Sequence, residues 1–192
     1  MTRLIGIGGP SGSGKSELAR RLSAVTGAPV VSLDSYYRDL DHLPLDERAK
    51  CNFDEPASMD DALLVNQCVA LANGEPIDVP RYDFFSHTQV AATQRIEPGG
   101  TVIIEGLFTL YWNDPRHLPH AGVYDVQERG RTPECVERQY FDTVRPMAEK
   151  YIRPTRKHAN VIVRGDSPLE ESVATVLAFA ANSPASYEAA LR

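Results

Sequence analysis

Apolar residues along this chain gather in short runs that alternate with amphipathic stretches. Four such runs predict buried strands, at residues 4–9, 29–33, 101–106 and 160–165. Between the first two, residues 15–26 predict a helix with Leu18, Leu22 and Val25 on one face and Gly27 as its stop. Strands that alternate with helices indicate an α/β fold with a mostly parallel sheet.

Three further segments complete the expected architecture. Ser58 and Asp61 predict the start of a helix whose apolar stripe is Leu64, Cys68 and Leu71 and whose end is Asn73-Gly74. Residues 75–96, with two prolines, predict an irregular or hairpin excursion. A long helix is expected from about Pro133, kinked near Pro146, and a last helix opens at the Ser-Pro-Leu-Glu capping box of residues 167–170. Only the last ten residues are expected to form a tail.

Length and composition narrow the class of protein. A chain of 192 residues favours one domain, and its net charge of -6 disfavours a nucleic-acid-binding surface, which requires clustered Lys and Arg. The absence of a membrane-length apolar run or leader pattern favours a cytoplasmic protein without membrane contact. The three scattered cysteines have no metal-ligand spacing and are expected to be idle thiols.

The segment GGPSGSGKS, residues 8–16, contains the chemistry that most restricts function. Gly9, Gly14, Lys15 and Ser16 satisfy the pattern GxxxxGK followed by Ser or Thr, and a strand precedes them while a helix follows. Glycines let backbone N–H groups surround an anion, the lysine reaches the β and γ phosphates, and the hydroxyl binds Mg²⁺. The predicted nucleotide-binding residues are Gly9, Ser11, Gly12, Ser13, Gly14, Lys15 and Ser16.

Two carboxylates at predicted strand ends fit a kinase. The chain has neither the NKxD nor the DxxG motif of GTPases, so a small-molecule kinase is the leading class. Asp34 follows a parallel strand, where open α/β sheets place ligands, and could accept a proton from an attacking hydroxyl or else cap the next turn. Glu105 ends the predicted central strand, either near Mg²⁺ or hydrogen-bonded to a loop.

From residue 3 to about 165 the sequence resembles the uridine kinase, or uridine-cytidine kinase, family. The resemblance rests on GGPSGSGKS, LDSYYRDL, NFDEPASMD, PRYDFFSHTQ, VIIEGLFTLY, ERGRTPECVERQY and VRPMAEKYIRPTRKHANVIVRG, in the family's order. It implies a single P-loop kinase domain of three layers, with a nucleoside-binding excursion at about 75–96 and a lid. It also implies ATP or GTP as phosphate donor, Mg²⁺, and a homo-oligomer, commonly a tetramer.

The same resemblance implies roles for individual residues on the acceptor side. Asp34 matches the catalytic base, Asp54 the carboxylate that holds the ribose hydroxyls, and Glu105 the acid of the metal and phosphate region. The other matching residues are Tyr37 and Phe53 beside Asp54, Tyr82 and His87 at the pyrimidine edge, Phe84 on the base, and Gln139 near the substrate.

The resemblance breaks at the lid, expected at about residues 125–132. Arg129 and Arg131 match lid arginines that close over the phosphates, but the strand, connection and arginine-rich helix that normally precede them are replaced by a direct step from Tyr124 to Asp125. Either the lid is shortened, or a mobile segment is missing from the sequence at this point. The missing segment is the favoured interpretation, because a lid is a segment that moves. A real deletion would favour a catalytically poor nucleotide-binding protein. A kinase for another alcohol, such as pantothenate, ribulose phosphate or nicotinamide riboside, is the remaining alternative.

Intact-mass spectrometry with peptide mapping across residues 124 and 125 tests the missing segment. We expect a protein heavier than the 21.2 kDa of the 192-residue sequence, with additional arginines before Asp125. These residues should become protease-resistant when an ATP analogue and a nucleoside bind together, because a lid closes over its ligands. A mass of 21.2 kDa would refute the missing segment.

Overall fold

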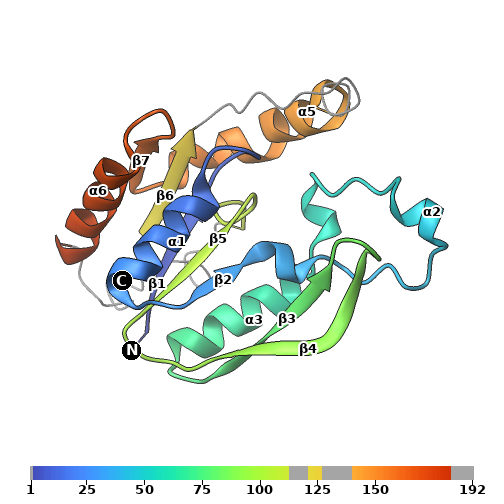
Figure 1. Ribbon diagram of the computed structural model, residues 1–192, viewed down its shortest axis with the longest axis horizontal. Helices are drawn as coiled ribbons and strands as arrows, with labels where there is room; N and C mark the ends of the chain where they lie inside the picture. Colours follow the sequence, from blue (N-terminus) through green and yellow to red (C-terminus); the bar gives the residue numbers. More distant parts are fainter. Residues whose placement is uncertain (1, 113–120, 127–139, 183–192) are drawn as a thin grey trace, which may run out of the picture.

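A computed structural model of the protein describes residues 2–112, 121–126 and 140–182. Its centre is a parallel sheet of strands in the spatial order β2-β5-β1-β6-β7 (Figure 1). The strands are β1 (Arg3–Gly8), β2 (Val30–Ser32), β5 (Thr101–Gly106), β6 (Ala121–Val126) and β7 (Val161–Arg164). The predicted α/β fold with a parallel sheet is therefore confirmed.

Alternating side chains on the strands divide the core between the two faces of the sheet. On β1, Ile5 and Ile7 pack on one face with helices α1 (Lys15–Thr26) and α6 (Leu169–Asn182), and Leu4 packs on the other. The second face is covered by α3 (Asp61–Ala72), whose stripe of Leu64, Cys68 and Leu71 is buried as predicted. The result is three layers, with α1 and α6 side by side over one face (Figure 1). None of the helices in the described ranges is long and apolar enough to cross a membrane.

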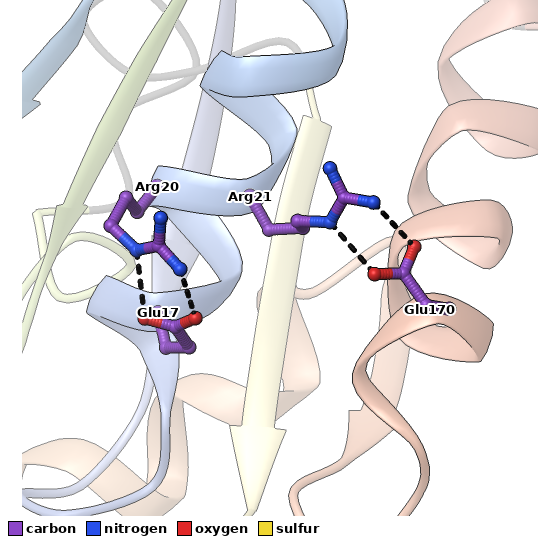
Figure 2. Close-up of polar contacts among 4 residues, drawn as sticks. All are labelled: Glu17, Arg20, Arg21 and Glu170. Carbon is purple, nitrogen blue, oxygen red and sulfur yellow. Dashed lines mark hydrogen bonds and ion pairs between the residues drawn. The ribbon is translucent and has the colours of Figure 1, made fainter.

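Helix α1 begins at Lys15 and ends before Gly27, as predicted, but two details of the helix predictions are wrong. Val25 is 50% exposed and does not belong to the buried face. Glu170, expected in a capping box, instead accepts hydrogen bonds from Nε and Nη2 of Arg21 at 2.7 and 3.2 Å, which joins α6 to α1 (Figure 2). Figure 2 also shows the pair of Glu17 and Arg20 within α1. Both pairs are exposed to solvent, so each contributes little to stability.

The predicted excursion at 75–96 is a two-stranded antiparallel hairpin of β3 (Ile77–Asp83) and β4 (Thr88–Ile96), with a bulge between Pro80 and Arg81. Ile77, Val79 and Ile96 bury its base against α3, whereas most of β4 is exposed. The chain between β2 and α3 forms three short helices: η1 (Leu33–Tyr36), α2 (Leu45–Arg48) and η2 (Pro56–Ser58). Figure 1 shows α2 standing away from the sheet beyond the turn of the hairpin.

Two helix boundaries differ from the sequence prediction. The cap of α3 is Asp60, whose carboxylate accepts from Leu63 N at 3.0 Å, while the Ser58 hydroxyl donates to Glu55 O instead. The expected long helix is described from residue 140, as π-helical η3 (Tyr140–Val144), α5 (Arg145–Met147), π-helical η4 (Ala148–Ile152) and η5 (Arg153–His158). The irregular turns flank Pro146, which cannot donate to the preceding turn. Residues 133–139 and the expected tail lie outside the described ranges.

The structure corrects the interpretation of the step from Tyr124 to Asp125. Strand β6 does not end at Tyr124: it continues to Val126 and pairs in parallel with β1 on one side and β7 on the other. Asp125 lies opposite Val163 and Val126 opposite Arg164. With six residues, β6 has an ordinary length for a strand, and the first two residues of the predicted lid, Asp125 and Val126, belong to the sheet.

Candidate active site

Three neighbouring strands end at one edge of the sheet, and their last residues are in register. Glu105 on β5 lies opposite Ile7 on β1 and Ser32 on β2. Gly106, the next residue, has no room for a side chain, since a Cβ there would lie 2.5 Å from Leu33 Cβ. This close approach brings the turn after β2 against the end of β5.

Glu105 is buried at this edge, and its carboxylate is hydrogen-bonded through both of its oxygens. Its side chain is 6% exposed, and its two oxygens accept from two serines: Oε1 from Ser32 Oγ at 2.7 Å and Oε2 from Ser16 Oγ at 3.0 Å. A hydroxyl that donates its proton in this way keeps lone pairs for a cation. Mg²⁺ commonly takes one or two protein oxygens and completes its shell with water and phosphate oxygens, so Ser16 and Glu105 fit such an ion.

The loop between β1 and α1 has the backbone of an anion site. Gly12 (φ 78°) and Gly14 (φ 100°) adopt left-handed conformations that side-chain-bearing residues rarely reach, and no side chain caps the first turn of α1. The Ser13 side chain is fully buried, yet its Oγ has no hydrogen-bond partner within the described residues. Lys15 Nζ lies 3.5 Å from Pro10 O. Uncapped N–H groups, the helix dipole and a lysine suit a phosphate group.

Asp34 follows β2 by two residues, in the first turn of η1. Burial raises the pKa of its carboxyl, and the negative charge of Glu105 raises it further, whereas Lys15 acts in the opposite direction. A carboxylate with a raised pKa is a better proton acceptor than an exposed one. Asp34 is therefore near both the phosphate loop and Glu105.

An aromatic cluster lies beside the Asp34 carboxylate and contains residues from three separate segments of the chain. Tyr37 is its centre, with ring centroids 5.3 Å from Phe53, 5.5 Å from Tyr82 and 6.2 Å from Phe84. The His87 ring stacks on Phe53 at 4.9 Å and an interplanar angle of 18°. Five residues predicted to bind nucleoside thus lie together, although Phe84 remains 57% exposed.

Two polar atoms in this cluster are buried without a partner. Tyr82 Oη and His87 Nδ1 have no hydrogen bond within the described residues, and burial raises the pKa of Tyr82 to about 12. Buried polar atoms are normally paired, and an unpaired one costs about 1–3 kcal/mol. Two such atoms facing one aromatic cluster are therefore available to a polar ligand.

Asp54 is the second carboxylate on this side of the site. Burial raises its pKa, and its backbone N–H donates to Asn52 Oδ1 at 3.0 Å. The nearby charges of Asp34 and Asp54 both help to raise the pKa of Tyr37, after burial as the main cause. Tyr37 is therefore close to both carboxylates.

In the structure most of the predicted site residues lie close together. Two residues that sequence analysis missed also contact this region. Arg129, Arg131 and Gln139 lie outside the described residues. Ser32 was missed, although a polar residue at the end of an apolar strand and two positions before Asp34 was a usable signal. Arg48, whose Nη1 donates to Ser86 O in the hairpin turn at 2.8 Å, was missed as well, because nothing in its local sequence distinguishes it from other helical arginines.

The fold and the loop define the class of protein. A glycine-rich loop from a central parallel strand to a helix, with carboxylates at the adjacent strand ends, is the arrangement of P-loop kinases. A model of the phosphoribulokinase / uridine kinase family matches residues 4–168, and the chain belongs to that family.

Similar proteins agree with this assignment. The chain is 40% identical to a uridine kinase of Deinococcus deserti, covering 83% of this chain and 86% of the relative. It is 38% identical to a uridine kinase of Staphylococcus epidermidis, covering 84% of this chain and 87% of the relative. The structure of a possible uridine kinase from Bacillus stearothermophilus has the same fold, with a TM-score of 0.59 and 17% identity over 84% of this chain and 88% of that one.

The alignment lengths show that this chain is shorter inside the matched region. The match to the Deinococcus protein runs over 178 residues, whereas 83% of the 192 residues is about 160. The relative therefore has roughly 18 positions without a counterpart here. A missing lid segment before Arg129 stays a prediction.

Replacing Asp34 with Asn should stabilise the folded protein at neutral pH. The folded-state pKa is raised, so ionised Asp34 costs stability above that pKa and costs none below the unfolded value. We expect a higher Tm for Asp34→Asn at pH 7, with a difference that shrinks as pH falls toward 3.8. Thermal unfolding followed by circular dichroism measures it, with the exposed Asp46→Asn as control. Equal melting of Asp34→Asn and the parent at pH 7 would contradict the burial argument.

Proposed function

We propose that this protein is an ATP-dependent pyrimidine ribonucleoside kinase that phosphorylates the 5′-hydroxyl of uridine or cytidine. The observation that carries the proposal is the pair of buried, unpartnered polar atoms, Tyr82 Oη and His87 Nδ1, in an aromatic cluster beside Asp34. An aromatic surface suits a planar base, and one hydroxyl with one ring nitrogen suits the polar edge of a pyrimidine. The names of the most similar relatives support the same substrate.

Asp34 is the proposed base. Its carboxylate accepts the proton of the 5′-hydroxyl as the oxygen attacks the γ-phosphorus, and the bond from that phosphorus to the β-γ bridging oxygen breaks. Lys15 neutralises the phosphoryl oxygens during transfer, as do Arg129 and Arg131 of the predicted lid. Because such transfers need little covalent chemistry, positioning and charge neutralisation supply most of the rate.

Ser16 and Glu105 are the proposed metal ligands. A Mg²⁺ ion held by Ser16 and Glu105 would supply positive charge to neutralise the phosphates of the bound nucleotide. Ser32 holds the other oxygen of Glu105 and so keeps the carboxylate from rotating away from Ser16. The nucleotide is proposed to bind along residues 9–16, with ATP as donor and GTP as the alternative.

Asp54 is the proposed ribose ligand. A carboxylate offers two acceptor oxygens, which match the two hydroxyls of a vicinal diol. Tyr37, Phe53 and Phe84 form the surrounding wall, and Gln139 is proposed near the substrate. We also propose, from the family resemblance and the sequence, a cytoplasmic homotetramer.

Two other functions have specific support. A kinase for another alcohol would use the same phosphate loop, and a panel of uridine, cytidine, pantothenate, ribulose phosphate and nicotinamide riboside with ATP and Mg²⁺ tests it. A nucleotide-binding protein with poor turnover is favoured by the positions of the Deinococcus relative that have no counterpart in this chain, if they belong to the lid. Tight ATP binding without turnover on any member of the panel would replace the proposed function with this one.

Replacing Asp34 with Asn should lower uridine turnover by roughly 10²–10⁴-fold, because only proton acceptance is removed. ATP affinity, measured by calorimetric titration, should change little. A kcat within a few-fold of the parent's, in a variant that folds, would eliminate Asp34 as the base.

Replacing Asp54 with Ala should raise the KM for uridine and reduce the preference for uridine over 2′-deoxyuridine by about tenfold or more, since a hydroxyl-binding group is lost. Steady-state kinetics on both nucleosides measure this. An unchanged preference would mean that another group contacts the ribose.

The pH dependence of the KM for uridine, compared with that for 2′-deoxyuridine, tests the role of Asp54 in the parent protein. Burial raises the pKa of Asp54, so acid protonates it at a higher pH than an exposed Asp. The KM for uridine should therefore rise on acidification more than the KM for 2′-deoxyuridine, and Asp54→Ala should abolish the difference. Identical pH profiles for both nucleosides in the parent would contradict the assignment.

A further inference from the structure

The turn of the β3–β4 hairpin holds His87 in an unusual backbone conformation. Among the described residues, His87 is the one non-glycine residue with a positive φ, at 54°. The left-handed region is unfavourable for a residue with a side chain, because Cβ comes too close to the following carbonyl oxygen. Something must therefore hold this turn, and the orientation of the His87 ring depends on it.

Part of the restraint lies within the turn. The Asp83 carboxylate accepts from Phe85 N at 2.9 Å through Oδ1 and from Ser86 Oγ at 2.7 Å through Oδ2. Ser86 Oγ also lies 2.7 Å from Thr88 Oγ1. These contacts shape the turn, but they do not join it to the rest of the protein.

Arg48, at the end of α2, makes that connection. Its guanidinium donates to three backbone carbonyls: Nε to Leu43 O at 2.7 Å, Nη2 to Asp41 O at 2.9 Å, and Nη1 to Ser86 O at 2.8 Å. The first two acceptors lie in the segment before α2 and the third directly precedes His87. The rigid, planar arrangement of donors in arginine suits such a three-way contact, which a lysine ammonium cannot reproduce.

Two weaker contacts join the same parts of the chain. Leu40 N donates to His87 O at 3.3 Å, and Gln89 Nε2 donates to Tyr37 O at 3.2 Å. Arg48 is also close enough to Tyr82 for its charge to oppose the rise in the tyrosine pKa that burial causes. The guanidinium thus lies near Tyr82 and contacts the residue before His87, and Tyr82 and His87 are the two members of the aromatic cluster whose polar atoms are buried and unpartnered.

We propose that Arg48 is a positioning residue for nucleoside selection: by joining the hairpin turn to residues 41–43, it holds His87 and Tyr82 toward the base. Arg48 itself is not assigned a contact with substrate. The inference rests on the proposed function, because it names the element that sets the geometry of that base-binding side.

The test replaces Arg48 with Met, which keeps much of the aliphatic stem and removes the donors. We expect kcat/KM for uridine to fall by roughly tenfold, mainly through a higher KM. An effect of this size is typical when one of two contacting residues is removed. ATP affinity should stay within about twofold, because the guanidinium of Arg48 bonds to residues 41, 43 and 86 and to none of the phosphate loop. Hydrogen exchange of residues 83–88 should rise in the absence of any nucleoside.

A double-mutant cycle separates positioning from general destabilisation. In a His87→Gly background, where glycine adopts the positive φ freely and the ring is absent, Arg48→Met should cost less than about threefold. The matched control is Arg95→Met on the same hairpin, whose exposed side chain pairs with Asp78 and Glu97; it should leave kinetics and exchange unchanged. If Arg48→Met does not fold, Arg48→Lys, with one donor nitrogen, should show the same KM effect.

Several outcomes would overturn the proposal. Unchanged uridine kinetics in both Arg48 variants, equal losses with and without His87, or a matching loss of ATP affinity would each refute the positioning role. Failure of the proposed function is distinguishable, because it would appear as a parent protein that phosphorylates neither uridine nor cytidine. The exchange measurement needs no substrate, so it decides independently whether Arg48 holds the turn.

Discussion

The geometry of the site depends on one buried carboxylate, that of Glu105. Both of its oxygens are occupied, one by Ser32 from β2 and one by Ser16 from the start of α1. Because β5 lies between β2 and β1 in the sheet, these contacts join the carboxyl ends of β2 and β5 to the start of α1, which follows β1. A buried carboxylate without such partners would be costly, so the two serines and the strand register support one another.

The phosphate side and the acceptor side of the site are formed by different kinds of structural element. The loop at residues 9–14 is anchored between a central strand and α1, both within the core. The acceptor side consists of loops, short helices and a hairpin whose second strand is mostly exposed. Asp34 and Tyr37, next to β2, connect the two sides, so the precision of the acceptor side depends on contacts such as those of Arg48.

Local sequence signals predicted elements better than their boundaries. The strand–loop–helix order at residues 3–26 and the buried stripe of α3 are confirmed, because they follow from glycine conformation and helical periodicity. The errors arose where two residues compete for one role, or where one side chain has two possible partners. Asp60 rather than Ser58 caps α3, and Glu170 contacts Arg21 rather than its own helix terminus. Strand β6 extends beyond Tyr124, since Asp125 and Val126 pair with Val163 and Arg164 of β7.

The sequence by itself determined which groups could do chemistry: the phosphate loop and the two strand-end carboxylates are recognisable from residue type and spacing, and the aromatic residues from the resemblance to the uridine kinase family. Only the tertiary structure decided how these groups meet. The hydrogen bond from Ser32 to Glu105 spans 73 positions and that from Arg48 to Ser86 spans 38. Neither has a local signature, because strand register and the docking of a hairpin turn depend on packing between segments that the order of residues does not place side by side.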